Sequence, residues 1–191
     1  MTPEEFRRYW EATYPVCPPV SYLLRRACGE RWLRIHTLPA GKRYAESEAE
    51  YREVLHRHNT VLTDLIGEGE PFIFVSAGYA ETLVPDLVRP EAAEHCPASR
   101  HFLTACMEDE PPRLYWHFFM DVQRWQPGMA DPMLRQVADY AVANVAFVSV
   151  ERQSIYAPYD GGADIVLSCA SERATLRHRY ADWLSTHPLG L

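Results

Sequence analysis

Residues 154–168 constrain the fold most, because they combine two alternating segments with a glycine turn, in the sequence S-I-Y-A-P-Y-D-G-G-A-D-I-V-L-S. On both sides of the turn apolar side chains recur with a period of two, which is typical of half-buried β-strands. Gly161 and Gly162 tolerate positive φ angles, so the chain can reverse there. Pro158 cannot donate a ladder hydrogen bond, which indicates an edge or a bulge at that point of the incoming strand. We therefore predict a hairpin.

Asp160 and Asp164 flank the predicted reversal. Two carboxylates beside small glycines can hold a cation or accept hydrogen bonds from a partner. The alternative is structural, with Asp160 in a local turn hydrogen bond and Asp164 capping or pairing with a neighbour. Two carboxylates four residues apart lack the ligand density of a calcium loop, which favours the structural role.

Length and composition predict one globular domain, residues 1–191. Hydrophobic residues make up 47% of the chain and five residues are tryptophan, which is enough for a packed core. The net charge of −7 makes a nucleic-acid backbone a poor partner. No run approaches the ~20 apolar residues of a membrane span, and the charged N-terminus lacks the apolar segment of a signal peptide. We expect neither nucleic acid nor membrane as a partner.

The cysteine pattern bears on location and on metal binding. Five cysteines, odd in number and without any C-x-x-C pair, are widely spaced: Cys17, Cys28, Cys96, Cys106 and Cys169. This pattern fits a reducing cytoplasm better than a disulfide framework or a zinc site. We therefore expect a cytoplasmic protein with no metal and no cofactor.

Helix caps and apolar periodicity predict the order of the elements. Helices are expected near residues 3–14, 20–28, 47–66, 131–144 and 171–186. Strands are expected at 31–38, 71–77, 113–125 and 146–151, and in the hairpin. Strands that cluster late in the chain favour an α+β fold, a single domain with a mainly antiparallel sheet and helices packed largely on one face. A doubly wound parallel sheet fits less well, because the motif G-x-G-x-x-G is absent.

Residues 78–112 break this pattern. Five prolines and several acidic residues occur there, which predicts an irregular surface insertion holding one short strand near residues 101–107. Loops of this length often carry function, so the insertion is a candidate lid or contact surface.

Polar side chains on three predicted strands form one concave surface if the mixed faces of these strands adjoin. In that arrangement His36, His117, Asp160 and Asp164 are candidate catalytic residues for acid–base or metal-assisted chemistry. The alternative is that each histidine is a hydrogen-bonded packing residue beside aromatic rings. The candidate binding surface consists of Arg34, Tyr115, Asp121, Tyr156, Tyr159, Asp160 and Asp164.

The loop G-K-R at residues 41–43 precedes a predicted helix N-terminus, where an anion could bind. Glu46, Glu48 and Glu50 crowd the first turn of the same helix and already satisfy its dipole. Anion binding at this loop is therefore the less favoured interpretation.

Three segments of the sequence resemble a known family. They are R-W-L-R-I-H-T-L-P-A-G-K-R-Y at residues 31–44, R-H-N-T-V-L at 57–62, and I-Y-A-P-Y-D-G-G-A-D-I-V-L at 155–167 followed by Y-A-D-W-L-S. The chain is similar to uncharacterised bacterial proteins of domain-of-unknown-function family 3885, in which a Y-D-x-x-G-x-D hairpin precedes a helix bearing W-L or W-I. Here Gly-Gly-Ala stands where the family has a bulkier, often charged residue. The resemblance implies a small cytosolic bacterial protein and supplies no reaction.

Two functions from different classes remain open. The first is a protein-binding module, of which an immunity-like inhibitor is one form, whose negative surface would speed association with a basic target. The second is a small hydrolase or metal-assisted enzyme that uses the His/Asp cluster near the hairpin. A flat surface that tolerates metal chelation favours the first, and a cleft that binds a metal or small ligand favours the second.

Overall fold

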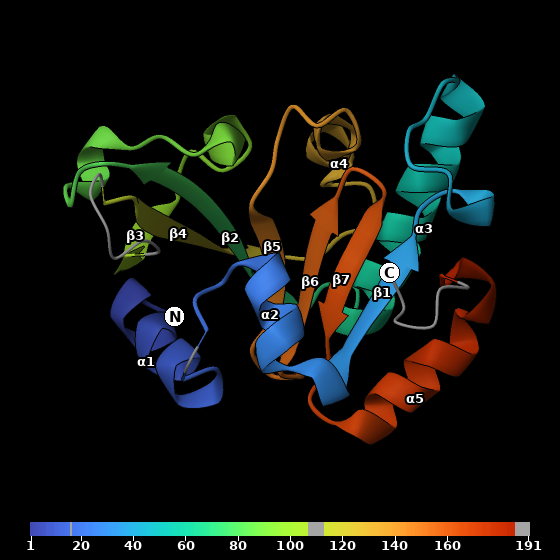
Figure 1. Ribbon diagram of the computed structural model, residues 1–191, viewed down its shortest axis with the longest axis horizontal. Coiled ribbons are helices and arrows are strands. Elements are labelled where there is room, and N and C mark those ends of the chain that lie inside the picture. The colour runs from blue at the N-terminus through green and yellow to red at the C-terminus, as the bar shows by residue number, and fades with distance from the viewer. Residues whose placement is uncertain (16, 107–112, 186–191) are drawn as a thin grey trace.

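The computed structural model describes residues 1–15, 17–106 and 113–185, and Figure 1 shows a single sheet with helices on both sides. In these ranges the sheet has seven strands in the order β1-β7-β6-β5-β2-β4-β3, and every neighbouring pair is antiparallel. The strands are β1 (Trp32–His36), β2 (Pro71–Ala80), β3 (Arg100–Cys106), β4 (Tyr115–Arg124), β5 (Val145–Ser149), β6 (Ser154–Tyr159) and β7 (Gly162–Val166). This arrangement confirms the predicted α+β fold with a mainly antiparallel sheet.

The helices of the described ranges divide between the two faces of the sheet. They are α1 (Pro3–Thr13), α2 (Ser21–Ala27), α3 (Glu48–Ile66), α4 (Asp131–Ala138) and α5 (Ala170–Arg179). The longest helix, α3, packs with α4 and α5 on one face, while α1 and α2 contribute to a second apolar cluster on the other. Short 3₁₀ turns connect the elements at Gly29–Arg31, Pro39–Gly41, Pro85–Leu87, Glu91–Glu94 and Ala181–Trp183. No helix in the described part of the chain combines the length and the apolar character that crossing a membrane requires.

The predicted hairpin is present as β6 and β7, joined by the two residues Asp160 and Gly161. Pro158 pairs with Ala163 of β7 but lies beyond the β5–β6 ladder, which ends at Phe147 opposite Tyr156. At Pro158 the strand therefore has a ladder partner on one side only, as its missing N–H requires.

The two turn glycines serve a purpose other than the predicted one. Neither Gly161 nor Gly162 adopts a positive φ, so that expectation is wrong. A Cβ at Gly162 would lie 1.9 Å from the Ile35 carbonyl oxygen, and one at Gly161 would lie 3.0 Å from Arg43 Cγ. Glycine is required here because the edge strand β1 and the loop that follows it approach the turn closely.

Some predicted boundaries differ from the structure. Helix α4 ends at Ala138 instead of residue 144, because Tyr140 and Asn144 have φ angles of 57° and 55°, which a helix does not accommodate. Helix α5 ends at Arg179. In the 78–112 insertion, residues 78–80 extend β2, and β3 is the expected short strand. Residues 107–112 and 186, which complete two of the predicted segments, lie outside the described residues.

Candidate functional site

Asp164 is buried and bound by the guanidinium of Arg34. The two residues lie directly opposite each other in the β1–β7 ladder, on the face of the sheet that α2 covers. Arg34 donates from Nε to Oδ1 at 2.7 Å and from Nη2 to Oδ2 at 3.0 Å. The Asp164 side chain is 3% exposed and that of Arg34 is 20% exposed, so the ion pair stands at the boundary between the core and solvent.

Asp160 is held in the same manner by Arg43. Arg43 Nε donates to Oδ2 at 3.0 Å, and Nη2 donates to Oδ1 at 2.9 Å. Asp160 comes from the turn between β6 and β7, and Arg43 from the loop after β1, where its side chain stem rests on Gly161. The Asp160 side chain is 5% exposed, whereas that of Arg43 is 59% exposed. The neighbour-pairing role that the sequence favoured for Asp164 therefore applies to both carboxylates.

Aromatic rings lie beside each of these guanidiniums. Arg34 Cζ is 4.8 Å from the centre of the Tyr159 ring and 5.5 Å from the centre of the Trp32 ring. Arg25 Cζ also lies near the Trp32 ring, 5.1 Å from its centre. At these distances each guanidinium is attracted to the ring. Arg43 in turn lies 5.5 Å from the ring of the exposed Tyr44. We call this set the arginine–aromatic strip: Arg25, Trp32, Arg34, Tyr159, Arg43 and Tyr44.

The protonation states in the strip follow from burial and from the paired charges. Burial raises the pKa of Tyr159 to about 12, so its hydroxyl keeps its proton at neutral pH. Burial alone would lower the pKa of Arg34, but the hydrogen bonds and negative charge of Asp164 more than offset this and raise it. Arg34 therefore stays charged and Tyr159 stays neutral over a wide pH range.

His117 does not join this site. It lies in β4, and four strands separate β4 from β1, which corresponds to roughly 24 Å across the sheet. Its ring is buried, with Nδ1 2.9 Å from Thr104 Oγ1 and Nε2 2.8 Å from the Thr82 carbonyl oxygen. Tyr115 and Asp121 lie on the same distant strand. The single concave surface expected from the three strands is therefore not formed.

Tyr156 points to the opposite face of the sheet, because it precedes Ala157 in the alternation of β6. Its hydroxyl is 2.5 Å from Nδ1 of His58, a histidine of α3 that is completely buried. Burial lowers the pKa of His58 to about 3 and raises the pKa of Tyr156. No sequence pattern pointed to this pair, because His58 and Tyr156 are 98 residues apart along the chain.

His36 is the one predicted histidine close to the hairpin. It lies two residues beyond Arg34 in β1, opposite Gly162, and it lines a cavity of about 480 Å³ with Asp182 and Trp183 among its walls. Burial, and then the positive charge of Arg34, lower its pKa. In the described ranges, no group of three or more His, Cys, Asp or Glu side chains is placed to hold a metal ion.

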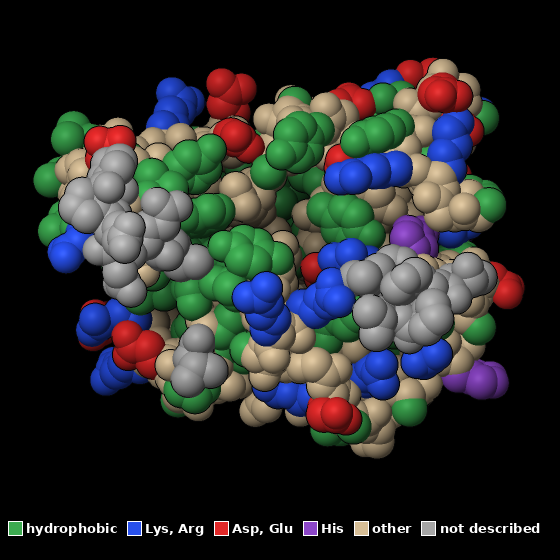
Figure 2. All heavy atoms as spheres, viewed as in Figure 1, with side chains coloured by type: hydrophobic (Ala, Val, Ile, Leu, Met, Phe, Trp, Pro, Cys, Tyr) green, Lys and Arg blue, Asp and Glu red, His purple; other side chains and the backbone are tan. Residues whose placement is uncertain are grey.

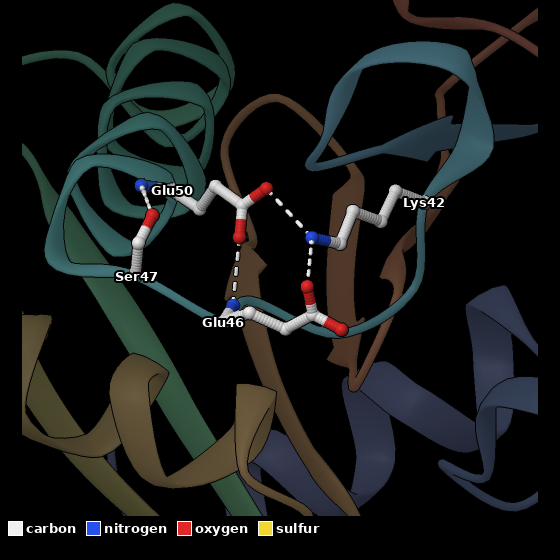
Figure 3. A network of polar contacts seen from close by, with 4 residues as sticks. All are labelled: Lys42, Glu46, Ser47 and Glu50. Carbon is white, nitrogen blue, oxygen red and sulfur yellow. Dashed lines mark hydrogen bonds and ion pairs between the residues drawn. The ribbon is translucent and has the colours of Figure 1, made fainter.

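The basic side chains of the G-K-R loop form ion pairs with carboxylates of the protein itself. Lys42 Nζ donates to Glu46 at 2.9 Å and to Glu50 at 2.7 Å, as Figure 3 shows. Ser47 caps α3 by accepting a hydrogen bond from the Glu50 backbone N–H, while the Glu50 carboxylate accepts one from the Glu46 N–H. Arg43 is bound to Asp160. These contacts agree with the interpretation that disfavoured an anion at the loop.

The sequence did not reveal a second surface feature, a group of exposed apolar side chains in the 78–112 insertion. Four large apolar side chains within residues 79–87 are exposed by 48% or more: Tyr79, Leu83, Val84 and Leu87. Tyr79 lies near the end of β2 and the other three follow it, all within the insertion that was a candidate lid or contact surface. Tyr79, Leu83 and Leu87 recur every four residues, as on one face of a helix, but no α-helix covers residues 79–87, so the spacing could not show which side chains face solvent.

These features define a single-sheet antiparallel α+β protein with a pair of arginine-bound carboxylates at its hairpin. The family model described as domain of unknown function (DUF3885) matches residues 20–188 of the 191 residues, and the chain belongs to this family. The resemblance drawn from the hairpin and the segments around it is confirmed. No curated protein and no solved structure shows a significant match to the chain.

Proposed function

We propose that this protein is a binding module that recognises another protein through the arginine–aromatic strip. The observation that carries the proposal is that both hairpin carboxylates are buried beneath arginines, while Arg43 and Tyr44 remain largely exposed. Arginine, tyrosine and tryptophan are the residue types that most often dominate binding energy at protein interfaces. Ion pairs that already hold the side chains in place reduce the entropy lost on binding.

The same geometry argues against the competing enzyme. Each oxygen of Asp160 and of Asp164 accepts a hydrogen bond from an arginine, and both carboxylates are at most 5% exposed, so a substrate or a metal ion has little access to either. His117 lies at the other end of the sheet, and its two ring nitrogens contact neighbouring residues. The four candidate catalytic residues therefore do not form one reacting group.

A cytoplasmic location is part of the proposal. Cys17, Cys28, Cys96 and Cys169 are free thiols, and the first three of them are buried. Free thiols persist in reducing compartments. A module that neutralises another protein by covering its surface, as an immunity-like inhibitor does, is one form that this function can take.

The proposal is tested by quantitative affinity enrichment from cells that produce the protein. We expect the double variant Arg25→Gln/Tyr44→Ala to lose the partners that the wild type enriches, because it removes one guanidinium and one exposed ring without breaking a buried ion pair. The matched control is Leu83→Ser/Leu87→Ser at the other end of the sheet, which should keep them. Retention of every partner by the strip variant, with an unchanged melting temperature, would contradict the proposal.

A further inference from the structure

The arginine–aromatic strip has donors left over after its internal ion pairs are made. Arg34 and Arg43 each use Nε and Nη2 for a carboxylate. Within residues 1–15, 17–106 and 113–185, neither Nη1 has a hydrogen-bond partner, and Arg25 pairs with no carboxylate. A guanidinium bound side-on keeps its remaining N–H groups in a fixed plane, which suits a second planar anion.

The charge of this face differs from that of the whole chain. The chain carries a net charge of −7, but residues 46–94 hold eleven acidic residues against three basic ones, so the negative charge is unevenly distributed. Figure 2 shows Lys and Arg side chains gathered between α2 and β1, with few Asp or Glu among them. Arg26, exposed at the end of α2, adds a further positive charge beside Arg25. The local field around the strip therefore attracts anions.

The number of available charges limits the size of the anion. Two of the three guanidiniums already share their charge with a buried carboxylate, so the strip can neutralise only a few negative groups. A nucleic-acid backbone carries a charge every few ångströms, and its length would extend over the acidic remainder of the protein. A short run of carboxylates avoids that repulsion, because exposed charges beyond roughly 8 Å are screened at physiological ionic strength.

We propose that the arginine–aromatic strip binds an acidic segment of the partner protein, with Asp or Glu carboxylates on the guanidinium edges and neighbouring side chains against the rings. This inference rests on the proposed function and names the chemistry of the partner. It also accounts for the buried aspartates, because they hold Arg34 and Arg43 in position before the partner arrives. Recognition of acidic motifs by arranged arginines is an established mode of peptide binding.

The test measures fluorescence anisotropy of a short labelled glutamate-rich peptide at low and at physiological salt. We expect salt-sensitive binding that Arg25→Gln weakens about tenfold, the loss that one charge-assisted contact produces. Tyr44→Ala should weaken binding less, and Arg43→Lys should lower affinity while keeping a cation on Asp160. The matched control, Arg89→Gln, removes an exposed arginine far from the strip and should leave binding unchanged.

Several outcomes would overturn the inference. They are equal binding of a peptide with lysines in place of the glutamates, tighter binding of a single-stranded oligonucleotide of equal charge, or an equal loss in Arg89→Gln. If the glutamate peptide fails to bind while Arg25→Gln/Tyr44→Ala still loses the cellular partners, the partner chemistry is wrong and the proposed function stands. If the variant also keeps those partners, both proposals fail.

Discussion

The two ends of the sheet use different means to hold their surface residues. At the β1–β7–β6 end, the carboxylates of Asp160 and Asp164 are buried and each is bound by an arginine. At the β2–β4–β3 end, the chain leaves large apolar side chains such as Leu83 and Leu87 exposed, 63% and 75% respectively. A buried charge must be paired, which sets its geometry, whereas an exposed apolar side chain has no such constraint. Ion pairs therefore fix the positions of the charged side chains at the first end, whereas no such contact fixes the exposed apolar side chains at the second.

The largest effect is expected from Arg34→Leu, which leaves Asp164 buried without its partner at the hairpin end of the sheet. Removal of one member of a buried ion pair costs about 3–5 kcal/mol of unfolding free energy, because the remaining charge is uncompensated. Urea unfolding checks this value. The double variant Arg34→Leu/Asp164→Leu is the control and should recover most of the loss, since an apolar pair replaces the ionic one. Wild-type stability in Arg34→Leu alone would show that the pair does not hold the hairpin end.

Acid should destabilise the hairpin end through His58. Burial lowers the pKa of His58 to about 3, below the usual value of about 6.5, and its Nε2 has no hydrogen-bond partner among the described residues. The unfolded chain then binds a proton that the folded protein does not, so stability is full above pH 6.5 and falls as the pH approaches 3. The expected slope is roughly 1.4 kcal/mol per pH unit in this window.

Urea unfolding at pH 7, 6, 5 and 4 measures the unfolding free energy of the wild type and of His58→Gln. The pH dependence of the variant should lack the slope that His58 contributes, so the difference between the two proteins should change by that slope as the pH falls. His178→Gln is the matched control, because His178 is exposed on α5 and should leave the slope unchanged. An identical pH dependence in His58→Gln and the wild type would assign the acid sensitivity to other groups.

The smallest effect is expected at the other end of the sheet. Leu83→Ser/Leu87→Ser should change the unfolding free energy by less than about 0.5 kcal/mol, because both side chains are already in water. Differential scanning calorimetry provides the check. A larger loss would show that these side chains are covered in solution. If this variant, and not the strip variant, loses the cellular partners, the contact surface belongs to the apolar end.

Much of the site could be predicted locally. The alternation of β6 and β7, and the shared face of Arg34 and His36, follow from the period of two in the sequence. Pro158 marked the point where β6 loses one ladder partner. The resemblance of the hairpin segments identified the family without any structure.

Other parts of the site could not be predicted, because they depend on the order of the strands. The expected grouping of His36 with His117 required β1 and β4 to be neighbours, but the sheet places four strands between them. For Arg43 the sequence offered only an anion loop, which it disfavoured, and nothing in it pointed to Asp160, a residue 117 positions away along the chain that Arg43 binds. Sequence patterns report periodicity and caps, and they contain no information about which distant segments meet.

The amino-acid sequence by itself therefore determined the α+β class, the hairpin and the family, because these depend on side-chain period and local motifs. The tertiary structure alone decided that Asp160 and Asp164 are buried beneath Arg43 and Arg34 and are not free ligands. It also created the requirement for glycine in the turn, because the Ile35 carbonyl lies too close to Gly162 to leave room for a side chain. The physical reason is that charge pairing and steric exclusion act between residues that are close in space. The order of the strands in the seven-stranded sheet determines which residues those are.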